Sequence, residues 1–348
     1  IEVTTKSILL NDFIKLIRTT NNKPELFILE KIVKKGHVII DLSFNIDENG
    51  KIKNDYEIVG LIKDASVYFL NKSNLKNINF NFNFQKDNYL FNEINFKAEE
   101  VNFTSKKLNI KKKKNSFLID AIVKNDQSNL NLNILKLLNL SFENIIIDDV
   151  KFKTNNEFSI EIDKKFKVKN INLNSDINIT QVKYKKFDII NNLLPEVNDL
   201  ILMNNHQLNL NYKDNKLLVN GEGEIHLNNK EVDEIKYSIN KKGQDLSINS
   251  ELFLQNLVLE QQDFLKIFFP QANKNIDFNN QKLKINFNNH NLTLTGSGKF
   301  KIDNDFEEID YFIEKKENKI SFNTNLNIKN TNFIIDKINY KKKDDSNI

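Results

Sequence analysis

The sequence predicts a mainly β protein: a long antiparallel meander of amphipathic strands curled into an elongated groove, with a few short helices. Three observations carry this prediction. Apolar and polar residues alternate along most of the chain, short polar links separate the alternating runs, and a segment of about 75 residues occurs twice.

The alternating runs are found in both halves of the chain, at Asn77–Phe84, Asn129–Ile134, Leu208–Tyr212 and Leu283–Phe287. Because successive side chains of a strand point to opposite faces, each run has one apolar and one polar face. Such strands are typical of antiparallel sheets with one solvated side. The apolar residues of these runs are candidates to line a groove: Phe80, Phe82, Phe84, Leu130, Leu132, Leu208, Leu210, Tyr212, Leu283, Ile285 and Phe287.

Short polar segments join the runs, at Lys213–Lys216, Asn228–Glu231, Lys241–Gln244 and Asn288–Asn291. Asn, Asp and Gly tolerate the left-handed backbone that tight turns need, so these segments predict hairpins. A helical pattern is present only in three short stretches: Asp12–Ile17, Phe187–Leu194 and Phe264–Phe269. Proline follows the last two and is expected to end each helix.

Those last two stretches begin the two copies of the internal repeat. After these stretches, His206–Leu227 aligns without gaps with Gln281–Ile302. Apolar positions coincide in the two copies, except that Leu218 is aligned with Thr293. Each copy is expected to contain a short helix and about four strands. We therefore divide the chain into an N-terminal extended β-sheet module at 1–180 and repeat units at 181–256 and 257–340, with a polar tail to 348.

The repeat also decides how the stretch Gly296–Lys299 is interpreted, since Gly-Ser-Gly-Lys resembles the end of a phosphate-binding loop. Its counterpart is Gly221–Glu224, where two glutamates would repel a phosphate, and Thr293 and Phe300 do not fit the loop pattern. We therefore interpret Gly221, Gly223, Gly296 and Gly298 as structural glycines of two strands. A repeated pair suggests close approach of the short helix, or a bend in the sheet.

Composition excludes several classes of function. Basic and acidic residues number 51 and 47, and Arg18 is the only arginine, which disfavours nucleic-acid binding. There is no cysteine for a disulfide or thiolate site, and no apolar run is long enough to cross a bilayer. The first residue is Ile, so we expect a fragment or a processed form. About sixty asparagines are best explained by codon bias.

No pattern of catalytic or metal-binding residues is present. The four histidines, His37, His206, His226 and His290, are far apart, and we expect them to face solvent. Asp148 and Asp149 would point to opposite faces of a strand. We therefore expect no enzyme activity, no cofactor and no metal. The lysine runs 111–114 and 341–343 are expected to be solvated, with attraction to anionic lipid as the alternative.

Three segments carry a resemblance to a known group of proteins: Phe264–Pro270 with the amphipathic meander after it, Lys35–Ile40 and Glu57–Ala65. In pattern they resemble the AsmA-like/TamB/YhdP group of Gram-negative envelope proteins. The resemblance implies a periplasmic protein anchored in the inner membrane through an N-terminal segment that this chain lacks. It also implies phospholipid transport to the outer membrane along a hydrophobic groove, with phospholipid acyl chains and the two membranes or their proteins as partners.

Two other kinds of protein are compatible with the same alternating strands. One is an extracellular or envelope β-scaffold or adhesion protein, with a closed core and a protein partner. The other is an outer-membrane barrel, whose strands also alternate, but the lack of Trp disfavours it because such barrels carry aromatic girdles.

Overall fold

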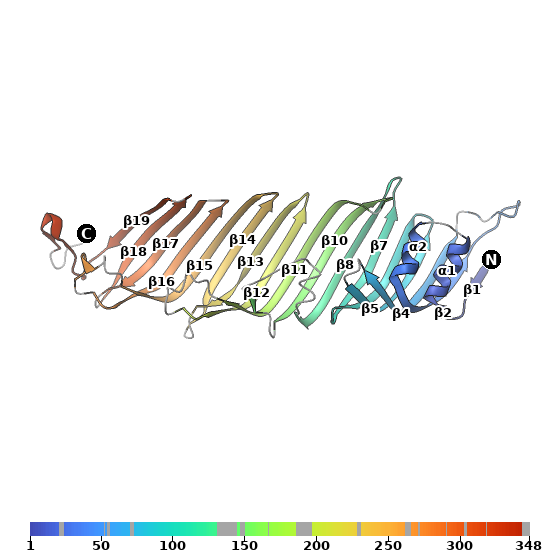
Figure 1. Cartoon of the computed structure of the whole chain (residues 1–348), viewed down its shortest axis with the longest axis horizontal. Helices are drawn as coiled ribbons and strands as arrows, with labels where there is room; N and C mark the ends of the chain where they lie inside the picture. Colours follow the sequence, from blue (N-terminus) through green and yellow to red (C-terminus); the bar gives the residue numbers. More distant parts are fainter. Residues whose placement is uncertain are drawn as a thin grey trace. The chain divides into compact units, whose positions relative to one another are not determined.

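The computed structural model describes the chain except for residues 21–23, 52, 54–55, 70–72, 131–144, 147–149, 166, 186–196, 228–230, 262–265, 271, 290, 303–304, 318 and 343–348. Among the described residues, 74% are in strands and 7% in helices. The predicted fold class, mainly β with a long antiparallel meander, is confirmed, and the sheet is open rather than closed (Figure 1). Two compact units can be distinguished: Ile1–Ser141 with Asp148–Asn178 and Leu210–Asp214, and Phe142–Ile147 with Ile179–Asn209 and Asn215–Ile348.

Both α-helices found among the described residues lie in the first unit. Its elements are β1 (Glu2–Thr4), β2 (Ile8–Leu9), α1 (Leu10–Thr20), α2 (Pro24–Ile32), β3 (Val33–Ser43), β4 (Glu57–Phe69), β5 (Ser73–Gln85), β6 (Asn88–Ala98), β7 (Val101–Lys112), β8 (Ser116–Asn129) and β10 (Lys151–Asp163). Strands β3 to β8 pair in chain order, and β10 follows β8. The predicted helix Asp12–Ile17 lies within α1, whereas α2 was not predicted.

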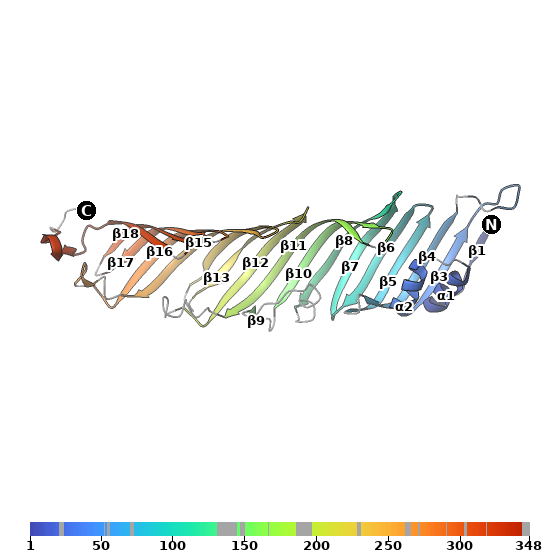
Figure 2. The ribbon, with the colours of Figure 1, turned by 45° about the horizontal axis from the view of Figure 1, so that its top comes forward.

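The second unit has the same hairpin order (Figure 2). Its elements are β9 (Ile145–Ile146), β13 (Lys216–His226), β14 (Asp233–Lys242), β15 (Asp245–Glu260), β16 (Asn275–Asn288), β17 (Asn291–Lys301), β18 (Phe306–Lys316), β19 (Lys319–Asn327), β20 (Ile334–Ile335), the 3-10 helix η1 (Asp336–Ile338) and β21 (Tyr340–Lys341). Strands β11 (Val168–Lys185) and β12 (Leu200–Lys213) have residues in both units. Of the other predicted helices, 187–194 lies outside the described residues. The predicted helix 264–269 is described only from residue 266, and residues 267 and 268 form a turn.

The turns follow the sequence closely. Asp214 and Asn215 have φ values of 50° and 60°, which is the backbone of a tight two-residue hairpin. The predicted turn at Lys241–Gln244 contains Gly243 with a φ of 60°. Glu99 and Glu100 make the same kind of turn with φ values of 45° and 71°, although glutamate rarely adopts them. A glutamate pair therefore turns the chain where the sequence carries no turn signal.

Bulges interrupt several strands at single residues with positive φ. Asp64, Asn77 and Asn280 have φ values of 51°, 53° and 50°, and the strand register shifts at each of them. Asn205, the repeat counterpart of Asn280, has a φ of 51°. Bulges increase the local twist and bend the strand in which they occur.

Candidate functional site

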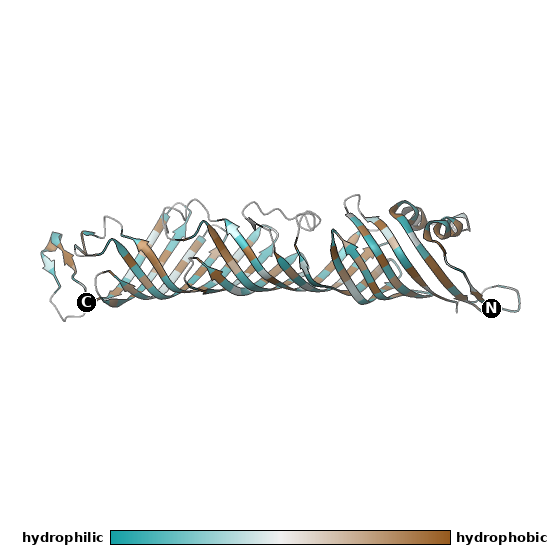
Figure 3. Cartoon of the chain, turned by 90° about the horizontal axis from the view of Figure 1, so that it is seen from below, coloured by the Kyte–Doolittle hydropathy of each residue, from teal (hydrophilic) through white to brown (hydrophobic). Residues whose placement is uncertain are grey.

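The candidate site is the apolar face of the sheet, considered separately in each unit. Brown and teal segments alternate along the strands in Figure 3, as the period of two requires. The strand registers place apolar residues of neighbouring strands opposite one another, so that each unit has a continuous apolar face.

In the first unit, part of this face is a packed core. Phe82 is only 4% exposed and belongs to one cluster with Val38, Ala65 and two residues of α1, Leu10 and Ile14. Helix α1 therefore covers this part of the apolar face. Phe82 therefore lies in a packed core that includes residues of the predicted helix, and not on an accessible part of the face.

Phe80 and Phe84, on either side of Phe82, are half-buried at the margin of this cluster. Their rings contact Phe91 of β6, each with a centroid distance of 5.4 Å in an edge-to-face arrangement. Phe82 lies across Gly60 of β4, where a β-carbon would come within 2.3 Å of the ring. The missing side chain of Gly60 thus leaves room for the aromatic ring of Phe82.

In the second unit, the predicted lining residues are half-buried. Leu283 pairs with Leu252, Ile285 with Leu294, and Phe287 with both Ile248 and Leu292. All of these side chains keep part of their surface accessible to solvent. On β19, Ile320 and Phe322 are 71% and 69% exposed. This face is therefore apolar and accessible.

Two equivalent clusters limit the apolar face near one end of the strands in this unit. One contains Val197, Ile201 and Ile225, and the other contains Phe269, Ile276 and Phe300. Ile201 and Ile225 correspond to Ile276 and Phe300 in the repeat. Val197, just before β12, and Phe269, before β16, thus pack at the end of the apolar face in the two copies.

The remaining predicted lining residues are distributed as follows. Leu130 is half-buried just after β8, and Leu132 lies outside the described residues. Leu208, Leu210 and Tyr212 are half-buried on β12. Asp148, Asp149 and His290 also lie outside the described residues, and His37 is exposed.

The repeated glycines make room for side chains of neighbouring strands. A β-carbon at Gly221 would lie 2.3 Å from the ring of Tyr237, and one at Gly296 would lie 2.1 Å from the ring of Tyr311. The expected approach of the short helix is thus replaced by a tyrosine from the paired strand. Large side chains that cover strand glycines restore packing lost with the missing β-carbon.

The second glycine of each pair faces a buried polar residue. His206 is 4% exposed and lies over Gly223, and its Nε2 is 3.2 Å from the carbonyl oxygen of Glu224. Burial lowers the pKa of His206, and the hydrogen bond to that carbonyl opposes the shift. Our expectation that this histidine faces solvent is wrong. Gln281, 1% exposed, takes its place in the other copy.

His226, which we also expected to face water, is half-buried. Its Nε2 lies 2.9 Å from the side-chain nitrogen of Asn204. A hydrogen bond to a strand neighbour therefore accounts for its position.

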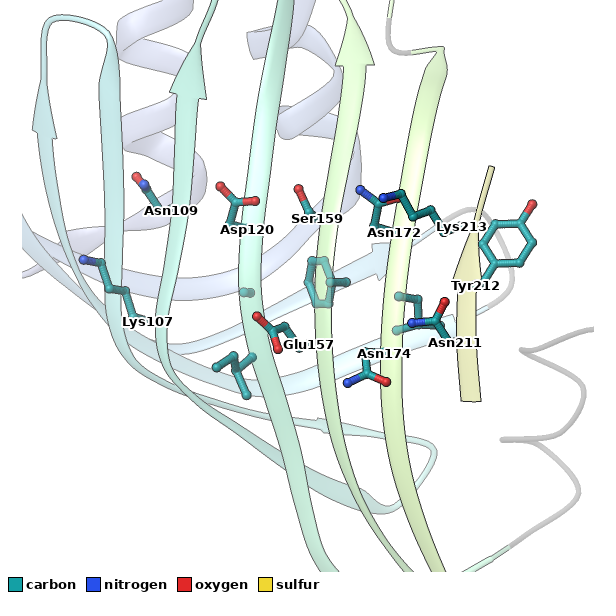
Figure 4. Close-up of a pocket in the computed structure, with 14 residues that line it drawn as sticks. Lys107, Asn109, Asp120, Glu157, Ser159, Asn172, Asn174, Asn211, Tyr212 and Lys213 are labelled. Carbon is teal, nitrogen blue, oxygen red and sulfur yellow. The ribbon is translucent and has the colours of Figure 1, made fainter. Parts of the chain in front are cut away.

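The first unit also contains a hollow of about 520 Å³, lined both by polar side chains and by Ala121, Phe158 and Leu173 (Figure 4). It is lined by residues of five strands: Lys107, Asn109, Asp120, Ala121, Ile122, Glu157, Phe158, Ser159, Asn172, Leu173, Asn174, Asn211, Tyr212 and Lys213. This hollow was not predicted from the sequence. Its residues are far apart in sequence, and only the pairing of the strands brings them together.

Metal sites, membrane-spanning helices and similarity to known proteins were also considered for the described residues. No set of three His, Cys, Asp or Glu residues suited to a metal ion occurs in the described part of the chain. None of its helices is long and apolar enough to cross a membrane. No family model, curated protein or solved structure matches this chain.

Proposed function

We propose that the protein is a non-enzymatic carrier of phospholipid, which binds acyl chains on the apolar face of its open β-sheet. One observation carries this proposal: Leu283, Ile285 and Phe287, with their cross-strand neighbours, form a face that is apolar and yet accessible. Exposed apolar patches of this kind mark binding surfaces in soluble proteins.

The energetics suit transport. Each buried methylene contributes about 0.8 kcal/mol, and neighbouring rows of Leu, Ile and Phe offer similar surfaces. A chain that moves from one row to the next therefore exchanges equivalent contacts, while its headgroup stays in water. The pattern resemblance to the AsmA-like/TamB/YhdP group supports a periplasmic location, transfer between the inner and outer membranes and a role in outer-membrane biogenesis.

The alternative is a β-scaffold protein with a closed core and a protein partner. The covered position of Phe82 favours this alternative for part of the first unit. The exposed Ile320 and Phe322 favour the lipid carrier for the second.

Native mass spectrometry of the protein purified from a Gram-negative host, followed by lipid extraction, distinguishes the two. The proposal expects phospholipid bound in at least equimolar amount. A folded protein free of lipid would support the scaffold.

A further inference from the structure

We propose that Lys241 and Lys315 bind the phosphate headgroup of a phospholipid whose acyl chains lie on the apolar face of the second unit. The two lysines occupy equivalent positions of the repeat, each four residues after the tyrosine that covers a strand glycine, Tyr237 or Tyr311. This inference rests on the proposed lipid carrier and adds to it the side chains that recognise the lipid.

Both lysines project from the apolar face, although they are charged. Each follows its tyrosine by an even number of residues in an uninterrupted strand, β14 or β18, so lysine and tyrosine point to the same side. Lys241 is paired with Leu217 and Leu246 on the two neighbouring strands. Lys315 is paired in the same way with a leucine and an isoleucine. Each lysine therefore continues a row of apolar side chains.

The two lysines lie at the margin of the apolar face, where β14 and β18 end in hairpin turns, and both are exposed. A lysine can lay its aliphatic stem along apolar surface while its ammonium group stays in water. A phospholipid requires the same arrangement, because its acyl chains leave water and its phosphate does not. A headgroup therefore comes to lie beside these ammonium groups when its chains occupy the adjacent apolar rows.

Neither ammonium group has a protein partner. In the part of the chain that the structure describes, no ion pair or side-chain hydrogen bond engages Lys241 or Lys315. On the polar face of the same strand, by contrast, the ammonium nitrogen of Lys236 lies 3.2 Å from a carboxylate oxygen of Glu222. The two lysines of the apolar face are therefore available to an external anion, and each offers three hydrogen-bond donors to phosphate oxygens.

The carboxylates of the apolar face are too distant to pair with these lysines. Along β13 to β19, every strand residue of which is described, only Asp233 and Glu307 place a carboxylate on that face. Each precedes its lysine by eight residues, which is roughly 26 Å along a strand. Both are buried and accept backbone hydrogen bonds, Asp233 from Gln255 and Glu307 from residues 329–331. Negative and positive charges of the apolar face thus lie at opposite ends of the strands.

The repeat sets the spacing of the two sites. Strands β14 and β18 are separated by β15, β16 and β17, so the two lysines are roughly 19 Å apart along the sheet at about 4.8 Å per strand. Across the intervening strands, Ile248 is paired with Phe287, and Phe287 with Leu292. A lipid that leaves one lysine therefore reaches the equivalent lysine while its chains stay on apolar surface.

The test measures the affinity of the full chain for two lipids with the same short acyl chains, dihexanoyl phosphatidic acid and dihexanoylglycerol, by titration calorimetry. Only the first carries a phosphate. We expect the double variant Lys241→Gln/Lys315→Gln to bind phosphatidic acid about tenfold more weakly and to bind dihexanoylglycerol as the wild type does. Added salt should weaken phosphatidic acid binding to the wild type more than to this variant.

Two further variants are matched controls. Lys282→Gln/Lys299→Gln removes the same charge from exposed positions of the polar face and should leave both affinities unchanged. Lys241→Arg/Lys315→Arg keeps the charge and should retain the affinity for phosphatidic acid. Circular dichroism establishes that each variant is folded.

The inference is overturned if the Lys241→Gln/Lys315→Gln variant loses affinity equally for both lipids, or if the polar-face variant loses as much affinity for phosphatidic acid. Glycerol 3-phosphate that binds as tightly as phosphatidic acid would also overturn it, because the lysines would then form a site for free phosphate. If both lipids bind and the lysine substitutions have no effect, this inference fails alone. If neither lipid binds the wild-type protein, the lipid-carrier proposal fails with it.

Discussion

The hydroxyl of Tyr311 lies over Gly296 and donates a hydrogen bond of 3.2 Å to the side-chain oxygen of Gln281. The side-chain nitrogen of Gln281 in turn donates at 2.8 Å to the carbonyl oxygen of Lys299. Burial raises the pKa of Tyr311 to about 12, so the phenol stays protonated and able to donate. This contact joins β16, β17 and β18 on the apolar face.

We predict that Gly296→Val destabilises the protein by about 1–3 kcal/mol, because a β-carbon there would lie 2.1 Å from the Tyr311 ring. Urea unfolding measures the change, and Thr295→Val, on the opposite face of β17, is the control. A double-mutant cycle with Tyr311→Ala should show strong coupling. Additive effects would mean that the glycine does not serve to admit the tyrosine.

The other copy of this contact should respond to pH, because His206 replaces Gln281. Its folded-state pKa is lowered by burial, so the unfolded chain takes up a proton first as pH falls. The free energy of unfolding therefore decreases as the pH falls below about 6.5, the ordinary pKa of histidine, and this decrease ends below the folded-state pKa of His206. His206→Gln should remove this part of the pH dependence.

Urea midpoints of both proteins at pH 7.5 and pH 5.0 give the measurement. Carboxyl groups contribute equally to the two proteins, so the difference between them reports His206. Equal losses of stability in both would contradict the assignment.

A third prediction concerns Glu307, which is 7% exposed at the start of β18. One of its oxygens accepts hydrogen bonds from the backbone nitrogens of Lys329, Asn330 and Thr331 at 3.0, 2.6 and 3.1 Å. Glu307→Ala leaves these donors without a partner and should destabilise the protein by about 2–4 kcal/mol. Glu308→Ala, whose side chain is on the exposed face, should cost less than about 1 kcal/mol in the same urea titration.

Some of the structure could be predicted from sequence and some could not. A period of two identifies strands because it reports a local property, and the repeat locates Gly221 and Gly296 at equivalent positions. The same period also places His206 and Gln281 in phase with apolar neighbours, and this pattern indicates that both side chains are buried.

Other features depend on contacts between distant segments. Helix α2, Pro24–Ile32, is apolar on several sides and shows no helical period. Whether Phe82 is covered depends on where α1 docks, which no local pattern states. The hollow of the first unit depends on residues from Lys107 to Lys213 that meet across five strands, so it could not be predicted from local sequence patterns.

The central claim, that acyl chains bind the apolar face, is tested most directly by site-specific photo-cross-linking along β16. Benzoylphenylalanine is placed in turn at positions 282 to 287, and cross-linked phospholipid is measured by mass spectrometry after irradiation in cells. We expect cross-links at Leu283, Ile285 and Phe287 and none at Lys282, Lys284 and Asn286, because the two sets face opposite sides of the strand. Uniform cross-linking at all six positions, or none at the three apolar ones, would contradict it.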